Sequence, residues 1–177
     1  MTTIPQTHQS TQNPKQTRPL NDKWDLYYHL PTDQNWGLDS YRVIMNNIES
    51  VEDVVKINES VNDNVIRNNM MFLMRNGIAP QWEDHKNRNG GSFSYKVHNK
   101  LVPNTWRKLF KYVTGESFSK NDDINHHING ITVSPKKSFC IIKVWMDNID
   151  FQDSSVFHEI TDERNKGCIF KKHQPEH

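Results

Sequence analysis

The chain has 177 residues, of which 22 are Lys or Arg and 21 are Asp or Glu, so its formal charge is +1 at neutral pH. This length suffices for one domain with a sizeable core, and the balanced charge argues against a protein that holds long nucleic acid mainly by neutralising phosphates. No apolar run approaches the ~18 residues that span a bilayer, and no signal-peptide core is visible. Cys140 and Cys168 give neither a disulfide framework nor metal-ligand spacing, so we expect a cytoplasmic protein without metal or cofactor.

The first 17 residues are rich in Thr, Gln and Pro and carry almost no large apolar side chain. Such a segment cannot bury enough surface to offset the entropy that ordering costs. We therefore predict a disordered N-terminal tail over residues 1–17 and one folded domain over residues 18–177.

The first part of the domain predicts two strands and a helix. Apolar residues alternate along KWDLYYHL, which predicts a half-buried strand over 23–30, and YRVIMNNI predicts a second strand over 41–48. Ser50, with Asp53 three residues later, matches a capping box, so a helix is expected to run from there to Ser60. Its buried stripe is expected to consist of Val54, Ile57 and Val61.

The middle of the chain predicts two strands and a second helix. A short apolar run predicts a buried strand over 69–75, and a polar loop that ends in paired glycines separates it from an alternating strand over 92–98. A helix is predicted over 103–114, because Pro103 suits its first turn and Gly115 suits its C-terminal stop.

The last part of the chain predicts a strand pair over 128–134 and 138–146, a third helix over 152–164 and a final strand over 168–170. The core contacts of the third helix are expected to be Val156, Phe157 and Ile160. Hairpin-like strands mixed with separated helices predict the α+β class, with an antiparallel sheet that helices cover on one face.

The five tryptophans differ in their sequence surroundings. Trp24 lies on the apolar face of a predicted strand and Trp106 on the apolar stripe of a predicted helix, so both are expected in the core. Trp36 and Trp82 lie in polar loops, where no local apolar pattern accounts for them. These two rings either fold back onto the body of the protein or are available to a ligand.

Trp145 is placed by strand parity. One set of alternate residues in its strand is uniformly apolar and is expected to face the helices: Cys140, Ile142, Val144 and Met146. Trp145 and Lys143 therefore share the opposite, open face of the sheet. Burial of Trp145 beneath a loop fits the pattern equally well.

Two loop tryptophans can hold a flat ligand between parallel rings. A cationic ligand gains a cation–π term of roughly 0.5–2 kcal/mol. Glu83, directly after Trp82, can accept hydrogen bonds from two adjacent N–H donors, such as those on the Watson–Crick edge of guanine, worth roughly 1.5–3 kcal/mol each. Lys136, Lys137 and Lys143 are candidates for holding phosphates, and solvated surface lysines are an equally good interpretation of them.

Six segments carry a family resemblance, and they stand in the same order as in that family: RPLNDKW (18–24), NW (35–36), SVEDV (50–54), NGIAPQWEDHKNRNGG (76–91), TGESF (114–118) and NGITVSPKKSFCIIKVW (129–145). From about Arg18 to about His173 the chain resembles the mRNA cap-binding translation initiation factor family, factor 4E. The WEDxKN core followed by paired glycines is specific, and the order of all six segments is more so.

The resemblance implies a curved antiparallel sheet with helices on its convex face and a slot on its concave face for the 7-methylguanosine cap of messenger RNA. Trp36 and Trp82 match the rings that stack on the methylated base, which is cationic. Glu83 matches the carboxylate that reads the N1 and N2 donors of the base. Trp145 matches the ring that lies against the N7 methyl group.

Three positions of the slot depart from the family pattern. Ser92 stands where the family has a basic residue that helps to hold the glutamate. Lys136 replaces a phosphate-binding arginine, which keeps the charge and loses bidentate geometry. Ile141 replaces a phosphate-binding lysine and cannot do that work, and Lys143, two residues along on the same face, is the natural substitute.

The resemblance also implies that the convex face docks a helical motif of a scaffold initiation factor or of a repressor. The matching positions are Pro19, Leu20, Val51 and Gly115. Val55 stands where the family usually has tryptophan, and Arg107 stands where an apolar residue is expected. Because a large aromatic anchor is missing, we predict altered affinity for the usual motif.

Non-enzymatic recognition of capped mRNA in translation initiation is the main hypothesis. The alternative is a protein-interaction module, or a competitor that regulates translation, with altered or lost cap and scaffold binding, as Ser92 and Ile141 indicate. A hydrolase acting on caps is a third hypothesis, and it is disfavoured because the sequence lacks a carboxylate cluster for metal-assisted phosphate hydrolysis.

Overall fold

The computed structural model of the protein describes residues 17–160 and 167–174. The elements in chain order are β1 (Pro19–His29), β2 (Arg42–Ser50), α1 (Val51–Ser60), α2 (Asp63–Asn68), β3 (Met70–Arg75), β4 (Gly91–His98), α3 (Val102–Thr114), α4 (Asp122–His126), β5 (Ile128–Pro135), β6 (Phe139–Met146) and β7 (Ile169–Lys172). Short 3-10 turns occur at Leu38–Ser40 and Ser154–Val156. Apart from Thr17, the predicted tail lies outside the described residues.

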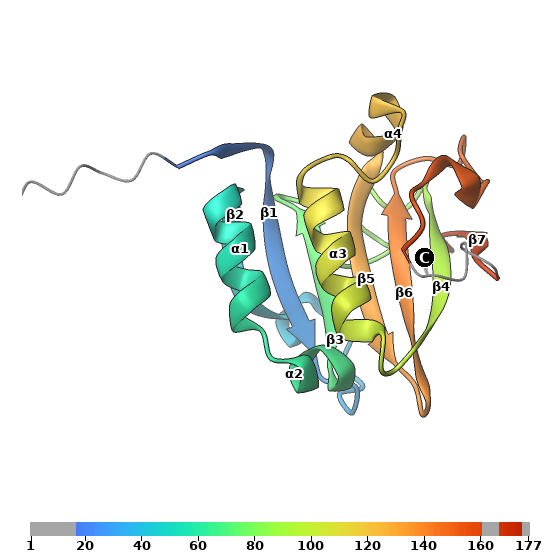
Figure 1. Ribbon diagram of the computed structural model, residues 1–177. Coiled ribbons are helices and arrows are strands. Elements are labelled where there is room, and N and C mark those ends of the chain that lie inside the picture. Colours follow the sequence, from blue (N-terminus) through green and yellow to red (C-terminus); the bar gives the residue numbers. More distant parts are fainter. Residues whose placement is uncertain (1–16, 161–166, 175–177) are drawn as a thin grey trace, which may run out of the picture.

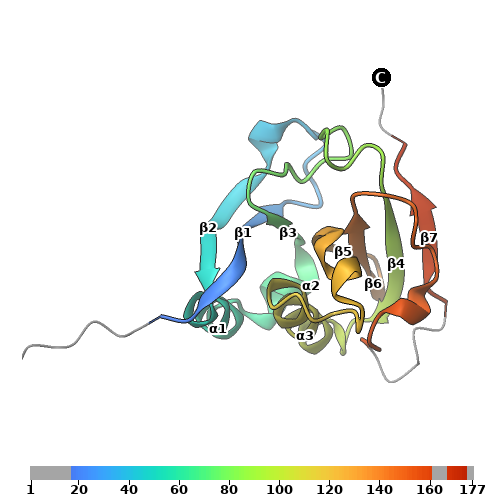
Figure 2. The ribbon, with the colours of Figure 1, turned by 90° about the horizontal axis from the view of Figure 1, so that it is seen from above.

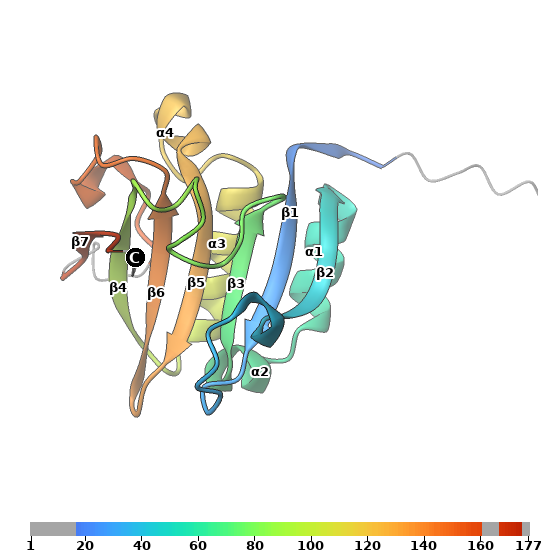
Figure 3. The ribbon, with the colours of Figure 1, turned by 180° about the vertical axis from the view of Figure 1, so that it is seen from behind.

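One curved sheet organises the molecule. Its seven strands follow the order β2-β1-β3-β5-β6-β4-β7, and all neighbouring strands are antiparallel. The helices α1, α2 and α3 cover one face (Figure 1), and the view from above shows that this is the convex face (Figure 2). The loops between β1 and β2 and between β3 and β4 lie on the opposite side (Figure 3), and the predicted α+β class is confirmed.

Helix α1 begins as its sequence predicts. The hydroxyl of Ser50 accepts a hydrogen bond from the backbone N–H of Asp53, and the carboxylate of Asp53 accepts one from the backbone N–H of Ser50, which completes the capping box. Val54 and Ile57 are buried beneath the helix, and Val61 packs half-buried against the same core. The helix thereby closes the β2 end of the convex face.

The main core lies between the helices and the convex face of the sheet. Trp24 and Trp106 are both buried in it, as their sequence patterns predict. The predicted parity of β6 is confirmed, because alternate residues of this strand are fully buried on the helix side: Cys140, Ile142, Val144 and Met146. A second, smaller apolar cluster lies on the concave face and consists of Phe72, Met74, Ile78 and Trp145.

Two predictions are wrong: the burial of Leu30 at the end of the first strand, and the third helix. Strand β1 ends at His29, so Leu30 is exposed instead of continuing the buried face of the strand. The helix predicted over 152–164 is absent from the described part of that range, where the chain forms only the 3-10 turn at Ser154–Val156 and then pairs Phe157 with Ser119 in a β-bridge. Residues 161–166 lie outside the described residues.

Two short helices were not predicted. Helix α2 is capped by the side chain of Asn62 and α4 by that of Asn121, and both are too short to show an apolar repeat. In the part of the chain that the structure describes, no helix has the length and apolar character needed to cross a membrane.

Candidate functional site

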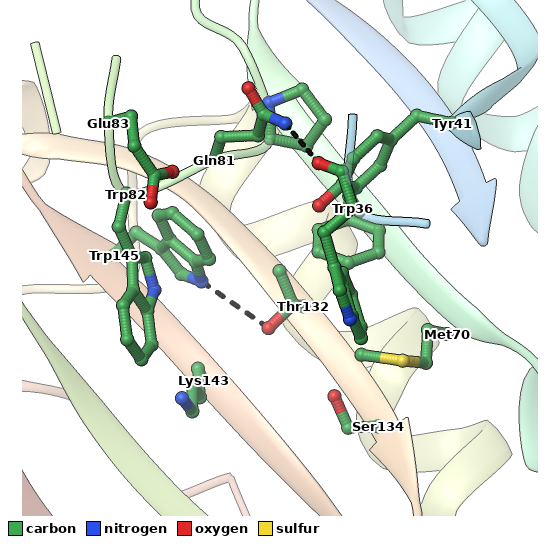
Figure 4. A pocket seen from close by; sticks show the side chains of 12 residues that line it. Trp36, Tyr41, Met70, Gln81, Trp82, Glu83, Thr132, Ser134, Lys143 and Trp145 are labelled. Carbon is green, nitrogen blue, oxygen red and sulfur yellow. Dashed lines mark hydrogen bonds between the residues drawn. The ribbon is translucent and has the colours of Figure 1, made fainter. Parts of the chain in front are cut away.

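The concave face carries a pocket of about 550 Å³ on the side of the sheet away from the helices. Its floor comes from β3, β5 and β6, and its walls come from the β1–β2 and β3–β4 loops (Figure 4). The lining residues are Trp36, Tyr41, Met70, Phe72, Pro80, Gln81, Trp82, Glu83, Thr132, Ser134, Lys143 and Trp145. The pocket therefore unites residues that lie far apart in the sequence.

Trp36 and Trp82 form the two walls of the pocket. Their side chains stand on opposite sides with open space between the two rings (Figure 4). Trp36 is 52% exposed and Trp82 is 36% exposed, so neither ring is folded into the interior. The side-chain amide of Gln81 donates a hydrogen bond to the backbone carbonyl of Trp36 and links the two loops directly. The arrangement is a slot with the shape of a flat ring.

The loop that carries Trp36 is held by its own polar side chains. The carboxylate of Asp33 accepts from the backbone N–H of Asn35 at 2.9 Å, and the side-chain oxygen of Asn35 accepts from the N–H of Gly37 at 2.8 Å. These turns account for the polar sequence around Trp36, since Asp and Asn provide local acceptors for backbone donors. The loop thus presents the indole without needing apolar neighbours in sequence.

The loop that carries Trp82 is built around two residues of the WEDHKN segment. The carboxylate of Asp84 accepts from the backbone N–H of Ala79 at 2.9 Å, and the fully buried Asn87 donates to the carbonyls of Ala79 and Gln81. Asn129 on β5 in turn donates to the side-chain oxygen of Asn87 at 2.9 Å. Asp84 and Asn87 therefore shape the loop and leave Trp82 and Glu83 free to face a ligand.

The paired glycines end this loop against the sheet. At Gly90 a Cβ atom would collide with the backbone carbonyl of Met146 on β6. Only glycine permits this close approach, which brings the end of the loop against the strand that carries Trp145.

Trp145 forms part of the floor of the slot. It is 4% exposed, and its indole N–H donates to the hydroxyl of Thr132 at 3.3 Å. The ring is therefore buried beneath the loops and also lines the pocket beside Lys143, so both interpretations from the sequence describe part of its position. Tyr41, Met70 and Phe72 complete the apolar lining and were not singled out from the sequence.

Glu83 lies at the rim of the slot. Within the described part of the chain no group donates a hydrogen bond to its carboxylate, so both oxygens remain available as acceptors. Burial raises the pKa of the nearby Tyr41 to about 12, and the negative charge of Glu83 contributes to the rise. The phenol is therefore uncharged at neutral pH, and Glu83 supplies the negative charge on this side of the slot.

Lysines gather at one end of the slot. Lys143 lines it, with its ammonium nitrogen 5.1 Å from the centroid of the Trp82 ring. Burial lowers the pKa of Lys143, and the positive charges of Lys136 and Lys171 lower it further. A bound anion would relieve this mutual repulsion, so the three ammonium groups make a candidate anion site.

Lys171 was missed in the sequence, although it lies beside residues of the sheet face that carries the slot. Lys171 on β7 pairs with Ser92 on β4, and Ser92 pairs with Trp145, so Lys171 supplies a basic group beside the position where Ser92 replaces one. Strand parity after Phe170, which packs on the core, points to this placement. Lys136 and Lys137 are both exposed in the β5–β6 hairpin and do not line the slot; Lys136 is close enough for its charge to act on Lys143.

The proposed partner residues lie on the convex side near α1 and the start of β1. Pro19 pairs with Ser50, Leu20 and Val51 are half-buried, and Val55 is 43% exposed. Gly115 ends α3 next to this region, where Glu116 accepts a hydrogen bond from Asn21 of β1. These residues therefore border one surface.

Arg107 is turned toward the helix junction on this surface. Its guanidinium donates to the carbonyls of Asn58 and Val61 and pairs with Asp63 at 2.7 Å. It therefore satisfies carbonyls at the C-terminal end of α1 and ties α1, α2 and α3 together.

The fold and the slot define a class of protein. It is an α+β recognition protein whose curved antiparallel sheet carries, on the concave face, two opposed indoles, an acceptor carboxylate and a group of ammonium ions. Such a site suits a flat, electron-poor ring with N–H donors on one edge and an anionic tail. No group of three or more His, Cys, Asp or Glu able to hold a metal occurs among the described residues.

Residues 19–174 match the family model described as "Eukaryotic initiation factor 4E", and the chain belongs to this family. It is 40% identical over 87 residues to the factor 4E homolog of Acanthamoeba polyphaga mimivirus, covering 49% of this chain and 29% of that protein. It is 30% identical over 138 residues to the factor 4E of Eremothecium gossypii, covering 74% of this chain and 63% of that protein. The matches thus span less than two-thirds of the length of these relatives.

Solved structures support the same fold. The complex of Caenorhabditis elegans eIF4E-3 with the 4E-binding protein Mextli and cap analog has a TM-score of 0.67 at 24% identity, covering 75% of this chain and 76% of that chain. The complex of Ascaris suum eIF4E-3 with m7G cap has a TM-score of 0.66 at 22% identity, covering 75% of each chain. At these identities the likeness concerns the fold.

Proposed function

We propose that the protein binds the 7-methylguanosine cap of messenger RNA without enzymatic activity and acts in translation initiation in the cytoplasm. The observation that carries the proposal is the pair of partly exposed indoles, Trp36 and Trp82, that face one another across a slot with the unpaired carboxylate of Glu83 at its rim. Related structures with this fold have been solved with cap analog and with m7G cap, which supports the same class of ligand here.

The methylated base would lie between the two indoles. Its positive charge favours electron-rich faces on both sides, which gives a cation–π term of about 0.5–2 kcal/mol beyond stacking. Glu83 would accept from the N1 and N2 donors of guanine through charge-assisted hydrogen bonds. Trp145, on the floor, would contact the N7 methyl group, because its ring lines the slot between the two walls (Figure 4).

The phosphates of the cap would meet the lysines at the other end of the slot. Lys143 is the central group, since it lines the pocket and already experiences the charges of Lys136 and Lys171. Lys137 would act only at a distance from its exposed hairpin position. This set replaces the arginine and lysine of the family pattern with point charges, so phosphate binding should depend on charge more than on bidentate geometry.

A protein partner on the convex face is a second, compatible role. Complexes of Caenorhabditis elegans eIF4E-3 with Mextli and of schistosome eIF4E with 4E-BP support a 4E-binding protein or scaffold factor as the class of partner. Val55 offers a small exposed side chain there, and Arg107 is already committed to α1 and Asp63. We propose that a helical motif docks on this surface with altered affinity.

Fluorescence titration tests the proposed ligand. The dinucleotide m7GpppG should quench tryptophan emission and bind at least about tenfold more tightly than GpppG, because only the methylated base carries the positive charge. Equal affinity for the two dinucleotides would contradict cap binding and favour an interaction module that has lost it. Release of nucleotide products from capped RNA in the presence of magnesium would instead identify a hydrolase.

A further inference from the structure

Each wall of the slot is backed by a buried histidine. His29 is fully buried and stacks on Trp36, with ring centroids 4.4 Å apart and planes 3° apart. His173 is 7% exposed and stacks on Trp82, with centroids 5.8 Å apart and planes 10° apart. Neither histidine belongs to the described residues that line the slot, so each covers the indole face turned away from it.

Each histidine is tied to the loop whose tryptophan it supports. His29 Nε2 lies 2.8 Å from the carbonyl of Asn35, the residue before Trp36. His173 Nδ1 lies 2.8 Å from the carbonyl of Asn87, in the loop of Trp82. A carbonyl only accepts, so the proton sits on the bonded nitrogen of each ring. The imidazoles therefore fix both the position and the tilt of the indoles.

The second nitrogen of each ring is buried without a hydrogen-bond partner among the described residues: His29 Nδ1 and His173 Nε2. Such a nitrogen can stay unprotonated, because a buried positive charge without a counter-ion is costly. The neutral form also keeps the indole electron-rich for a cation on its other face. A protonated imidazole would place its charge against the same ring and would repel a cationic guest.

The groups around His173 favour its neutral form. Burial lowers the pKa of His173, the hydrogen bond to the carbonyl of Asn87 partly opposes this, and the ammonium group of Lys143 on β6 lowers the pKa further. The other rings against His173 are the uncharged Trp82 and Trp145. Around His29, the tilted ring of Tyr41 is 5.2 Å away and is an uncharged phenol at neutral pH.

Two backbone contacts place further uncharged residues beside the histidines, and the charged Lys172 directly precedes His173 in the chain. In the sheet His29 pairs with Met70 of β3, and the backbone N–H of His173 donates to the carbonyl of Gly90. No carboxylate among the described residues pairs with either imidazole.

We propose that His29 and His173 are positioning residues that hold Trp36 and Trp82 as the two walls of the slot, and that protonation of His173 weakens the binding of a cationic base. The inference rests on the proposed function, since it concerns the affinity of the same slot. It adds two residues and an acid sensitivity to that slot, and it makes His173, directly after β7, important for ligand binding.

Three variants test the proposal. The double variant His29→Phe/His173→Phe keeps a flat ring behind each indole and removes the titration. The double variant His29→Ala/His173→Ala removes the ring. His85→Phe is the matched control, because His85 is an exposed histidine of the Trp82 loop that stacks on no indole. Circular dichroism confirms the fold of each variant before titration.

Affinity is measured for m7GpppG and GpppG at about pH 7.5 and about pH 5.5, where histidine changes charge. The bridging phosphates of these dinucleotides keep their charge over this range. On acidification the natural protein and the His85 variant should lose roughly two- to fourfold more affinity for m7GpppG than the Phe variant does, because burial leaves part of the His173 population neutral at the lower pH. At pH 7.5 the Ala variant should bind roughly tenfold more weakly than the Phe variant. For GpppG, whose base is uncharged, the loss of affinity on acidification should be the same in the natural protein and in the Phe variant.

An equal acid loss in the natural protein and the Phe variant would overturn the proposal and assign the effect to another group. Equal affinities of the Phe and Ala variants at pH 7.5 would overturn the positioning role. If the natural protein does not prefer m7GpppG at pH 7.5, the proposed function fails. The stacking of the histidines on the indoles is then tested by the pH dependence of tryptophan fluorescence in the free protein. Acid quenching that the Phe variant lacks supports the stacked histidines, and identical titrations of the two proteins refute them.

Discussion

Removing one wall of the slot should cost most of the affinity without harming the fold. Trp36 is 52% exposed, and one face of its ring is covered by His29, so a ligand can stack only on the other face. The change Trp36→Ala removes one base–indole stack, worth about 1–3 kcal/mol, and one cation–π contact, worth about 0.5–2 kcal/mol. The expected loss is about 1.5–5 kcal/mol, or about 10- to 5,000-fold in dissociation constant.

Isothermal titration of m7GpppG measures this loss independently of tryptophan fluorescence. Leu38→Ala is the matched control, because Leu38 is exposed, lies two residues further along the same loop and does not line the slot. The control should bind within about 0.5 kcal/mol of the natural protein. A less than threefold loss for Trp36→Ala, with the melting temperature of both variants unchanged, would refute the sandwich.

Four further outcomes are expected. Glu83→Gln should weaken m7GpppG binding by about 1.5–3 kcal/mol, because a neutral amide replaces a charged acceptor; an unchanged dissociation constant would show that the base edge points elsewhere. Lys171→Gln should weaken binding several-fold and flatten its dependence on salt, whereas Lys172→Gln, on the opposite parity of β7, should not; equal salt slopes would remove Lys171 from the phosphate site. Ser50→Ala should lower the free energy of unfolding by about 1 kcal/mol through loss of the α1 cap, measured by urea denaturation, and an effect below 0.3 kcal/mol would contradict the capping box. Because the pKa of His173 is lowered from 6.5 by burial and then by Lys143, the unfolded chain takes up its proton first as pH falls, so stability should decline on acidification below pH 6.5; His173→Gln should flatten this decline, and an unaltered slope would show that the imidazole is not buried neutral.

Local patterns sufficed where structure depends on local chemistry. Ser50 and Asp53 predict the start of α1, because both partners of the capping box lie within one turn of the helix. The parity of β6 placed Trp145 and Lys143 on one face, since a strand alternates whatever packs above it. The loop tryptophans Trp36 and Trp82 were recognisable because nothing local explained them. These features locate the two walls and part of the floor of the slot.

Non-local contacts account for what the sequence did not reveal. The spacing of Val156, Phe157 and Ile160 fits a helix, yet Phe157 instead forms a bridge with Ser119, a residue from a distant part of the chain. His29 lies on the concave side of β1 as an ordinary polar residue until the Trp36 loop folds over it. His173 stands in a polar C-terminal segment, and only the close approach of the Trp82 loop buries it.

The hydrogen bond from the Gln81 side chain to the backbone carbonyl of Trp36 joins the two loops that carry the walls of the slot. Because this bond couples the two loops, an outward movement of either loop would have to break the bond or draw the other loop with it. A planar ring that fits between the indoles without moving the loops should therefore bind more readily than a thicker, puckered molecule. If Gln81 were replaced by a shorter side chain that reaches the Trp36 carbonyl only through a water molecule, the loops could move further apart. The slot should then accept a wider range of ligands and bind each of them more weakly.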